Sequence, residues 1–134
     1  MAAAAQDDAG RIVGFAVGMP SSSNEPGLER YVGDLKLLGV LPEVEGRGVG
    51  SRLVCFVAAA LNAKGLLPML VWTWDGSDRA QRFYVTRIGA HGPLARKSVP
   101  CEPSTMKFDQ VAFVWPDADS LLRLCGHEQP PSQP

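Results

Sequence analysis

The sequence has little that would suggest a membrane, secreted or nucleic-acid-binding protein. No apolar run approaches the roughly 20 residues that a helix needs to cross a bilayer. The opening M-A-A-A-A-Q-D-D-A-G has neither the basic start nor the apolar centre of a secretory signal. The net charge is −1 and Lys/Arg-rich blocks are absent, which gives no support to binding of nucleic acid or anionic lipid. We therefore expect neither a nucleic acid nor a membrane as a partner.

Cysteine and histidine are also scarce. The three cysteines, Cys55, Cys101 and Cys125, are an odd number without a C-x-x-C pair, so they imply neither a disulfide framework nor a zinc site. We interpret Cys55, which lies in an apolar helical run, as a small core residue. His91 and His127 are far apart and lack acidic or cysteine neighbours at ligand spacing, so no metal is expected. This cysteine usage favours a reducing cytoplasm.

What is present fits one globular domain. The chain has 134 residues, of which 46% are hydrophobic and 20% charged, which is enough for one core and too little for two ordinary domains. We expect this domain to cover residues 1–125. Residues 126–134 are rich in Pro and Gln, a composition typical of a disordered tail.

Apolar periodicity and turn residues predict an α/β domain with a mixed sheet. Strands are expected at residues 2–6, 11–19, 31–41, 66–74, 94–99 and 110–115. Helices are expected from residue 48 to 65 and from Ser77, as the cap, to Gly89, with a short helical turn at residues 118–124. Gly39, within a strand, predicts a bulge or a close backbone approach.

The stretch E-V-E-G-R-G-V-G-S-R lies between a predicted strand and a predicted helix. It matches neither G-x-x-x-x-G-K-[ST] nor G-x-G-x-x-G, since Gly46, Gly48 and Gly50 are spaced G-x-G-x-G. A glycine-rich turn before a helix exposes unpaired amides to an anion, and Arg47 and Arg52 would add positive charge. A plain strand-to-helix connection explains the glycines equally well.

The surroundings of this stretch decide between the two. The run L-G-V-L-P-E-V-E-G-R-G-V-G-S-R-L resembles the acetyl-CoA signature of the GCN5-related N-acetyltransferase (GNAT) superfamily, in which a strand is followed by [Q/R]-x-x-G-x-[G/A] at the start of a helix. R-I-V-G-F-A-V-G is similar to the preceding strand of that family. S-D-R-A-Q-R-F-Y-V-T-R-I-G-A is similar to its second motif, N-x-x-A-x-x-F-Y-x-x-x-G-F.

The resemblance implies a mostly antiparallel mixed sheet with two main helices and a splayed central pair of strands. It implies acetyl-CoA as co-substrate, with its pantetheine arm along the strand that ends near Val40 and its pyrophosphate on the glycine loop. The cofactor-binding residues implied are Leu38, Gly39, Val40, Glu45, Gly46, Arg47, Gly48, Val49, Gly50, Ser51, Ser77, Ala80 and Tyr84.

Tyr84 and Asp34 are the catalytic candidates that the resemblance implies. Tyr84 matches the family tyrosine that donates a proton or hydrogen bond to the departing sulfur, although a helix-face tyrosine also packs in many cores. Asp34 lies on the strand from which many relatives project an acidic base, and a solvated carboxylate explains it as well. Asp75 and Asp78 are weaker candidates for the base.

Three departures from the family pattern bear on function. Glu45 stands where the family prefers Gln or Arg, and Ser77 stands where it prefers Asn. The strand and helices that normally precede the first hairpin are missing from this chain, which would leave an edge strand and an apolar sheet face exposed. A homodimer is one way to cover that face.

The leading hypothesis is an N-acetyltransferase that moves the acetyl group to an amine of a small molecule or peptide. One alternative is a non-catalytic acyl-CoA-binding or regulatory subunit, which the three departures would suit. A further alternative is a shortened family member that has lost cofactor binding and serves only as an interaction partner.

Overall fold

The structure is a computed structural model that describes residues 1–101, 103 and 106–126. The strands are β1 (Ala2–Gln6), β2 (Ile12–Pro20), β3 (Gly33–Val40), β4 (Met69–Trp74), β5 (His91–Pro100) and β6 (Lys107–Val114). The helices are α1 (Val49–Ala63), α2 (Asp78–Ile88) and α3 (Ala118–Leu124), with a short 3-10 turn, η1 (Pro42–Val44), before α1. Every element that the sequence predicts is present in the predicted order.

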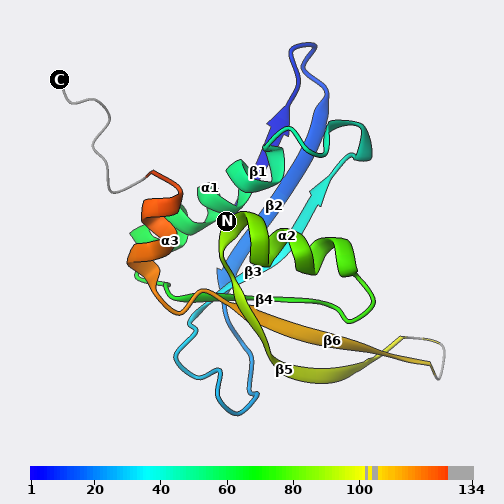
Figure 1. Cartoon of the computed structure of the whole chain (residues 1–134), viewed down its shortest axis with the longest axis vertical. Helices are drawn as coiled ribbons and strands as arrows, with labels where there is room; N and C mark the ends of the chain where they lie inside the picture. Colours follow the sequence, from blue (N-terminus) through cyan, green and yellow to red (C-terminus); the bar gives the residue numbers. More distant parts are fainter. Residues whose placement is uncertain (102, 104–105, 127–134) are drawn as a thin grey trace.

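The six strands form one mixed sheet in the order β1-β2-β3-β4-β6-β5. All neighbouring strands are antiparallel except β3 and β4, which are parallel. In Figure 1, β1, β2 and β3 run up the view, whereas β4, β6 and β5 cross its lower half. This confirms the predicted mixed α/β fold with a mostly antiparallel sheet.

The central strands β3 and β4 part soon after they meet. They are paired only at Gly33 with Met69 and at Asp34 with Leu70. Beyond that point β3 continues to pair with β2 alone. The expected splayed pair is therefore present, and the opening between the two strands begins at Asp34.

Of the two alternatives predicted for Gly39, a close approach is observed there, whereas the bulge of β3 lies elsewhere. The register against β2 shifts between Val17 and Gly18, so that Lys36 is the extra residue of the bulge. Gly39 instead allows a close approach, because a Cβ there would collide with the ring of Phe15. The register shift depends on the partner strand and could not be placed from the sequence of β3 alone.

Helix α1 begins where the glycine loop ends. Gly48 is its N-cap with φ +83°, a left-handed conformation that favours glycine. A Cβ on Gly50 would lie 3.2 Å from the Phe83 ring, so this glycine lets α1 and α2 pack closely. The inward face of α1 then buries a regular apolar stripe that consists of Val49, Leu53, Val54, Val57, Ala58 and Leu61.

Helix α2 begins after Ser77, as predicted, but the expected side-chain cap is not formed. Ser77 is the N-cap residue and its side chain makes no capping hydrogen bond. Its backbone N–H donates to the Trp74 carbonyl, while Gln81 Nε2 donates to the carbonyls of Trp74 and Asp75. The turn before α2 is therefore closed by the backbone of Ser77 and the side chain of Gln81.

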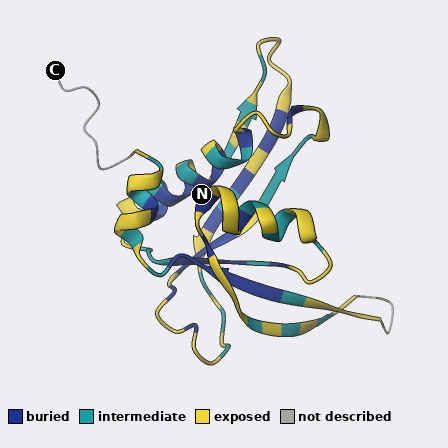
Figure 2. Cartoon of the chain, in the orientation of Figure 1, coloured by how far each residue is buried: buried dark blue, intermediate teal, exposed yellow. Residues whose placement is uncertain are grey.

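The two faces of the sheet are covered unequally. The main core cluster joins the sheet to all three helices through residues such as Leu61, Ile88 and Leu121. A smaller cluster on the opposite face is closed by Leu28 and Tyr31, from the connection between β2 and β3. Figure 2 shows the burial concentrated between the sheet and the helices.

Several large apolar side chains of the first strands are exposed. Phe15, Met19 and Leu37 are 45%, 38% and 52% exposed. Along β2, Phe15 and Met19 alternate with Gly14 and Gly18, whose added Cβ atoms would meet α1, and so they point to the face opposite the helices. Leu37 of β3 pairs with Val17, which lies between Phe15 and Met19 on that same face. The predicted exposure of an apolar face is thus observed.

Cys55 and Cys125 form a disulfide that links α1 to the end of α3. The interpretation of Cys55 as a small core residue with a free thiol is therefore wrong. The pairing could not be predicted from the sequence, because the number of cysteines is odd and the two partners are 70 residues apart. They meet only when α3 packs against α1. Since disulfides persist in oxidising surroundings, the cysteines no longer favour a reducing compartment.

The expected disordered tail lies largely outside the described residues, which end at residue 126.

Among the described helices, none combines the length and apolar character needed to traverse a lipid bilayer.

The disulfide predicts a thiol count and a change in stability. Denatured, non-reduced protein should contain one reactive thiol, that of Cys101, and the double variant Cys55→Ser/Cys125→Ser should lose free energy of unfolding. The chain-entropy model gives about 4 kcal/mol for a loop of this size, which urea unfolding can measure. Cys101→Ser is the control and should not change stability, because Cys101 is exposed. Three reactive thiols in the wild type would contradict the pairing.

Candidate functional site

The opening between β3 and β4 is the centre of the candidate site. Because β3 has lost β4 as a partner beyond Asp34, alternate N–H and C=O groups on that edge of the strand face the opening. Leu38 and Val40 are partly buried against the main core, while Gly39 carries no side chain that would narrow the gap. A ligand with amide groups could pair with this exposed backbone edge.

The glycine loop leads from η1 into α1 with unpaired amides. The first intrahelical bond is donated by the Arg52 amide to the Gly48 carbonyl, and no side chain caps the helix. The amides of Val49, Gly50 and Ser51 therefore lack intrahelical partners. The Arg52 guanidinium lies beside Gly48. Amides, helix dipole and guanidinium together suit a phosphate group.

Glu45, the residue that departs from the family motif, forms an ion pair in the structure. Arg79 Nη2 lies 2.9 Å from Glu45 Oε1 and links the glycine loop to the first turn of α2. The Arg79 side chain is 81% exposed, so this contact is weak by the standards of surface ion pairs. Sequence reasoning missed it because the residues belong to different elements.

Tyr84 lies on the inward side of α2. Its ring meets those of Phe83 and Trp115 edge to face, at centroid distances of 5.4 and 6.1 Å. Burial raises the pKa of the Tyr84 phenol to about 12. Among the described residues Trp72 Nε1 is the one buried side-chain polar atom without a partner. The Tyr84 phenol stays neutral at ordinary pH and could donate a proton or a hydrogen bond to a ligand that reached it.

Asp34 lies at the point where the opening begins and is 7% exposed. Burial raises the pKa of its carboxyl, while the charges of Lys36 and Lys97 lower it to a smaller extent. Its pairing with Met19 of β2 puts its side chain on the face opposite the helices. A carboxylate whose pKa is raised is a stronger base than an ordinary aspartate.

The remaining candidate residues of the site, Ser77, Ala80 and Asp75, lie at or near the start of α2. Ala80 packs partly buried against the core in the first turn of α2, and Ser77 precedes it. Asp75 is bound by Arg96, with a distance of 2.7 Å between Asp75 Oδ2 and Arg96 Nη1, so it is not a free base. Within the described ranges, no group of three or more His, Cys, Asp or Glu residues is arranged to hold a metal ion.

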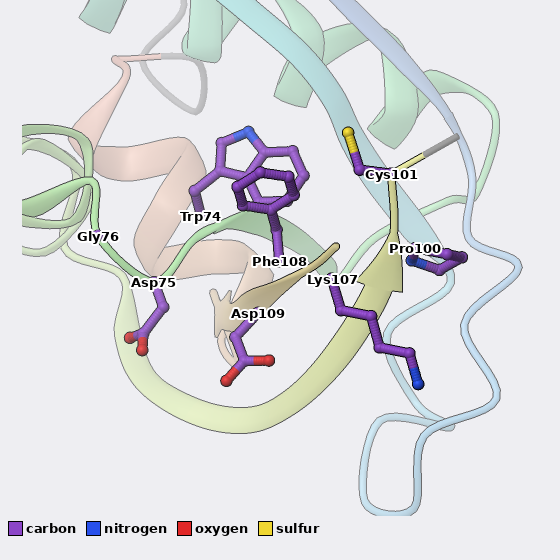
Figure 3. Close-up of a pocket in the computed structure, with 8 residues that line it drawn as sticks. All are labelled: Trp74, Asp75, Gly76, Pro100, Cys101, Lys107, Phe108 and Asp109. Atoms are coloured by element: carbon purple, nitrogen blue, oxygen red, sulfur yellow. The ribbon is translucent and has the colours of Figure 1, made fainter. Parts of the chain in front are cut away.

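Sequence reasoning missed a cavity of about 710 Å³ at the carboxyl end of β4. It is lined by residues 74–76, 100–101 and 107–109 (Figure 3). The rings of Trp74 and Phe108 meet edge to face at 5.5 Å, and the Cys101 thiol points to the same side, whereas Asp75 and Asp109 point to the other (Figure 3). The alternating aromatic residues of W-T-W, at the end of β4, were the one feature of the sequence that could have indicated this cavity.

Comparison with known proteins adds the family context. The acetyltransferase (GNAT) domain profile matches residues 2–89, from β1 to the end of α2. No curated protein is similar enough in sequence to count as a relative.

Several solved structures share the fold at low sequence identity. Naa20 of Chaetomium thermophilum, solved with a bisubstrate analogue, matches with a TM-score of 0.60 and 19% identity over 84% of this chain and 64% of its own. Nourseothricin acetyltransferase matches at 0.64 and 17%, over 83% and 61%. Arabidopsis thaliana NAA60, solved with acetyl-CoA, matches at 0.63 and 16%, over 81% and 68%. The chain thus spans about two thirds or less of their lengths.

Proposed function

Because the chain belongs to the acetyltransferase (GNAT) domain family, we propose that it transfers the acetyl group of acetyl-CoA to an amine. The observation that carries this proposal is the joint geometry of the site. The strand β3 has an open backbone edge, the helix α1 that follows it starts with unpaired amides, and α2 carries a buried phenol on its inward side. This combination offers separate places for the pantetheine arm, the pyrophosphate and the departing sulfur.

Two side chains of the protein would transfer the protons of the reaction. Acetyl-CoA supplies a thioester whose C–S bond breaks as a C–N bond to the attacking amine forms. Tyr84 would donate its phenolic proton to the departing thiolate, and Asp34 would accept, directly or through water, a proton from the amine nitrogen. The Tyr84 phenol is protonated at neutral pH, and the rise of its pKa to about 12 makes it a weaker acid that would first donate a hydrogen bond to the sulfur. The raised pKa of Asp34 makes its carboxylate a stronger base.

The remaining cofactor contacts come from the loop and the strand. Leu38, Gly39 and Val40 would bind the pantetheine amides through their backbone. Residues 46–51 would bind the pyrophosphate, assisted by Arg47, while Ser77 and Ala80 would lie near the cofactor at the start of α2. We propose the cytoplasm as the location because acetyl-CoA is available there, whereas the Cys55–Cys125 disulfide by itself favours oxidising surroundings. Fractionation of the native cells that left the protein outside the cytoplasm would contradict this proposal.

Tyr84→Phe should retain acetyl-CoA affinity and lose turnover by about a hundredfold or more, because the sulfur loses its proton donor. Steady-state rates with a panel of amines and calorimetry of acetyl-CoA binding would measure both. Tyr31→Phe, at the chain's other tyrosine, is the matched control. Full activity in the Tyr84 variant would remove this residue from the mechanism, and binding without turnover in the wild type would favour the non-catalytic alternative.

The same tyrosine has a pH signature. A phenol pKa raised from 10.0 to about 12 stabilises the folded protein below pH 10, and this contribution is lost as pH rises through 12. Tyr84 ionisation should therefore not reduce turnover at neutral or mildly alkaline pH.

Glu45→Gln should tighten acetyl-CoA binding about two- to fivefold, since it removes a carboxylate near the pyrophosphate and releases Arg79. Arg79→Gln should weaken binding, and the double variant should return close to the wild-type affinity. Glu43→Gln is the control, because Glu43 is in the same segment and pairs at 2.9 Å with Arg11 instead. Titration calorimetry measures the four affinities. Unchanged affinity in Glu45→Gln would mean that this carboxylate points away from the cofactor.

We also propose a homodimer that covers the exposed apolar face. Phe15, Met19 and Leu37 are the side chains that a second copy would bury. Sedimentation equilibrium should give twice the monomer mass of 14.3 kDa, and Leu37→Asp should shift the protein to the monomer. A wild type that sediments only at the monomer mass at high concentration would contradict this.

A further inference from the structure

The cavity lies at the end of β4, one of the two strands that border the opening. Leu70 is the last residue of β4 that pairs with β3, and Trp74 lies four residues further along. Residues at even spacing along a strand share a face, so Leu70, Trp72 and Trp74 lie on the face of Asp34. The bulge at Lys36 turns Leu38 to the other face, so the connection between the cavity and the start of the opening runs along β4.

The cavity has one apolar side. Trp74 and Phe108 are 45% and 40% exposed, which is unusual for large aromatic residues in contact with one another. Their rings meet at 5.5 Å with an interplanar angle of 74°. The Cys101 thiol joins them on the same side (Figure 3). These groups offer an angled apolar surface to a ligand, with one ring set edge-on to the other.

The carboxylates of the described lining are bound by side chains outside it. Asp75 is held by Arg96 at 2.7 Å, and the same guanidinium lies 3.4 Å from Asp109. Ser98 Oγ also donates to Asp109 at 2.8 Å. Lys107 is the positively charged residue of the described lining.

We propose that this cavity binds the non-reacting part of the acceptor, and that the acceptor is an amine carried on an aromatic body. The proposal rests on the acetyltransferase function argued above. It assigns to Trp74 and Phe108 the binding of the aromatic group, with the amine directed into the opening between β3 and β4. Aliphatic polyamines lack the aromatic group that the exposed rings would bind.

Steady-state kinetics with tryptamine and spermidine test the proposed acceptor class. Trp74→Ala and Phe108→Ala should each raise the KM for tryptamine about tenfold and leave the KM for acetyl-CoA unchanged. Phe56→Ala, which removes a 54% exposed aromatic ring from α1, is the matched control and should leave both values unchanged. Lower KM for spermidine than for tryptamine, or unchanged KM values in both cavity variants, would overturn the proposal.

A second measurement needs no acetyl-CoA. Cys101 is the chain's one free cysteine, so its alkylation by iodoacetamide reports on the cavity alone. Tryptamine should slow this reaction in the wild type and not in Trp74→Ala, with Cys101→Ser as the blank. Protection without acetyl transfer would refute the proposed function and leave the aromatic-amine site standing. Absence of protection at tryptamine concentrations that saturate the wild type or reach the millimolar range would overturn the site.

Discussion

The separation of two parallel strands is the constraint on which the rest of the structure depends. Strands β3 and β4 share only the pairs that end at Asp34 and Leu70, and each then keeps a partner on its outer side alone. An unpaired backbone edge is costly inside a protein unless water or a ligand satisfies it. The sheet therefore contains at its centre, and not at its border, a row of groups that a ligand can bind.

The neighbouring elements depend on this separation. Helix α1 starts from the loop that follows β3, and α2 starts from the loop that follows β4, so both helix starts lie at the open end of the strand pair. The connection before α2 also forms one wall of the aromatic cavity. The opposite face of the sheet, which carries Asp34, is covered only in part by Leu28 and Tyr31. The helix starts and Asp34 therefore lie on different faces of the sheet.

Local patterns were sufficient for the elements and for the glycine loop, because periodicity, caps and turn residues act over short stretches. Contacts between distant segments were not predictable in this way. The Cys55–Cys125 bond joins residues 70 positions apart, and Arg79 reaches Glu45 from another helix. The bulge at Lys36 needs the register of two strands. The aromatic cavity needs three segments to be brought together, so single-segment reasoning had no means of finding it.

The close contact between Gly50 and Phe83 has a consequence for how this site can vary. A Cβ at position 50 would lie 3.2 Å from the Phe83 ring, so the ring would have to shift by a few tenths of an ångström to admit even an alanine. Phe83 is followed directly by Tyr84, so a larger residue at the start of α1 would press on α2 next to the phenol. The sizes of residues 50 and 83 are therefore coupled, and a change at one is best accommodated by a change at the other.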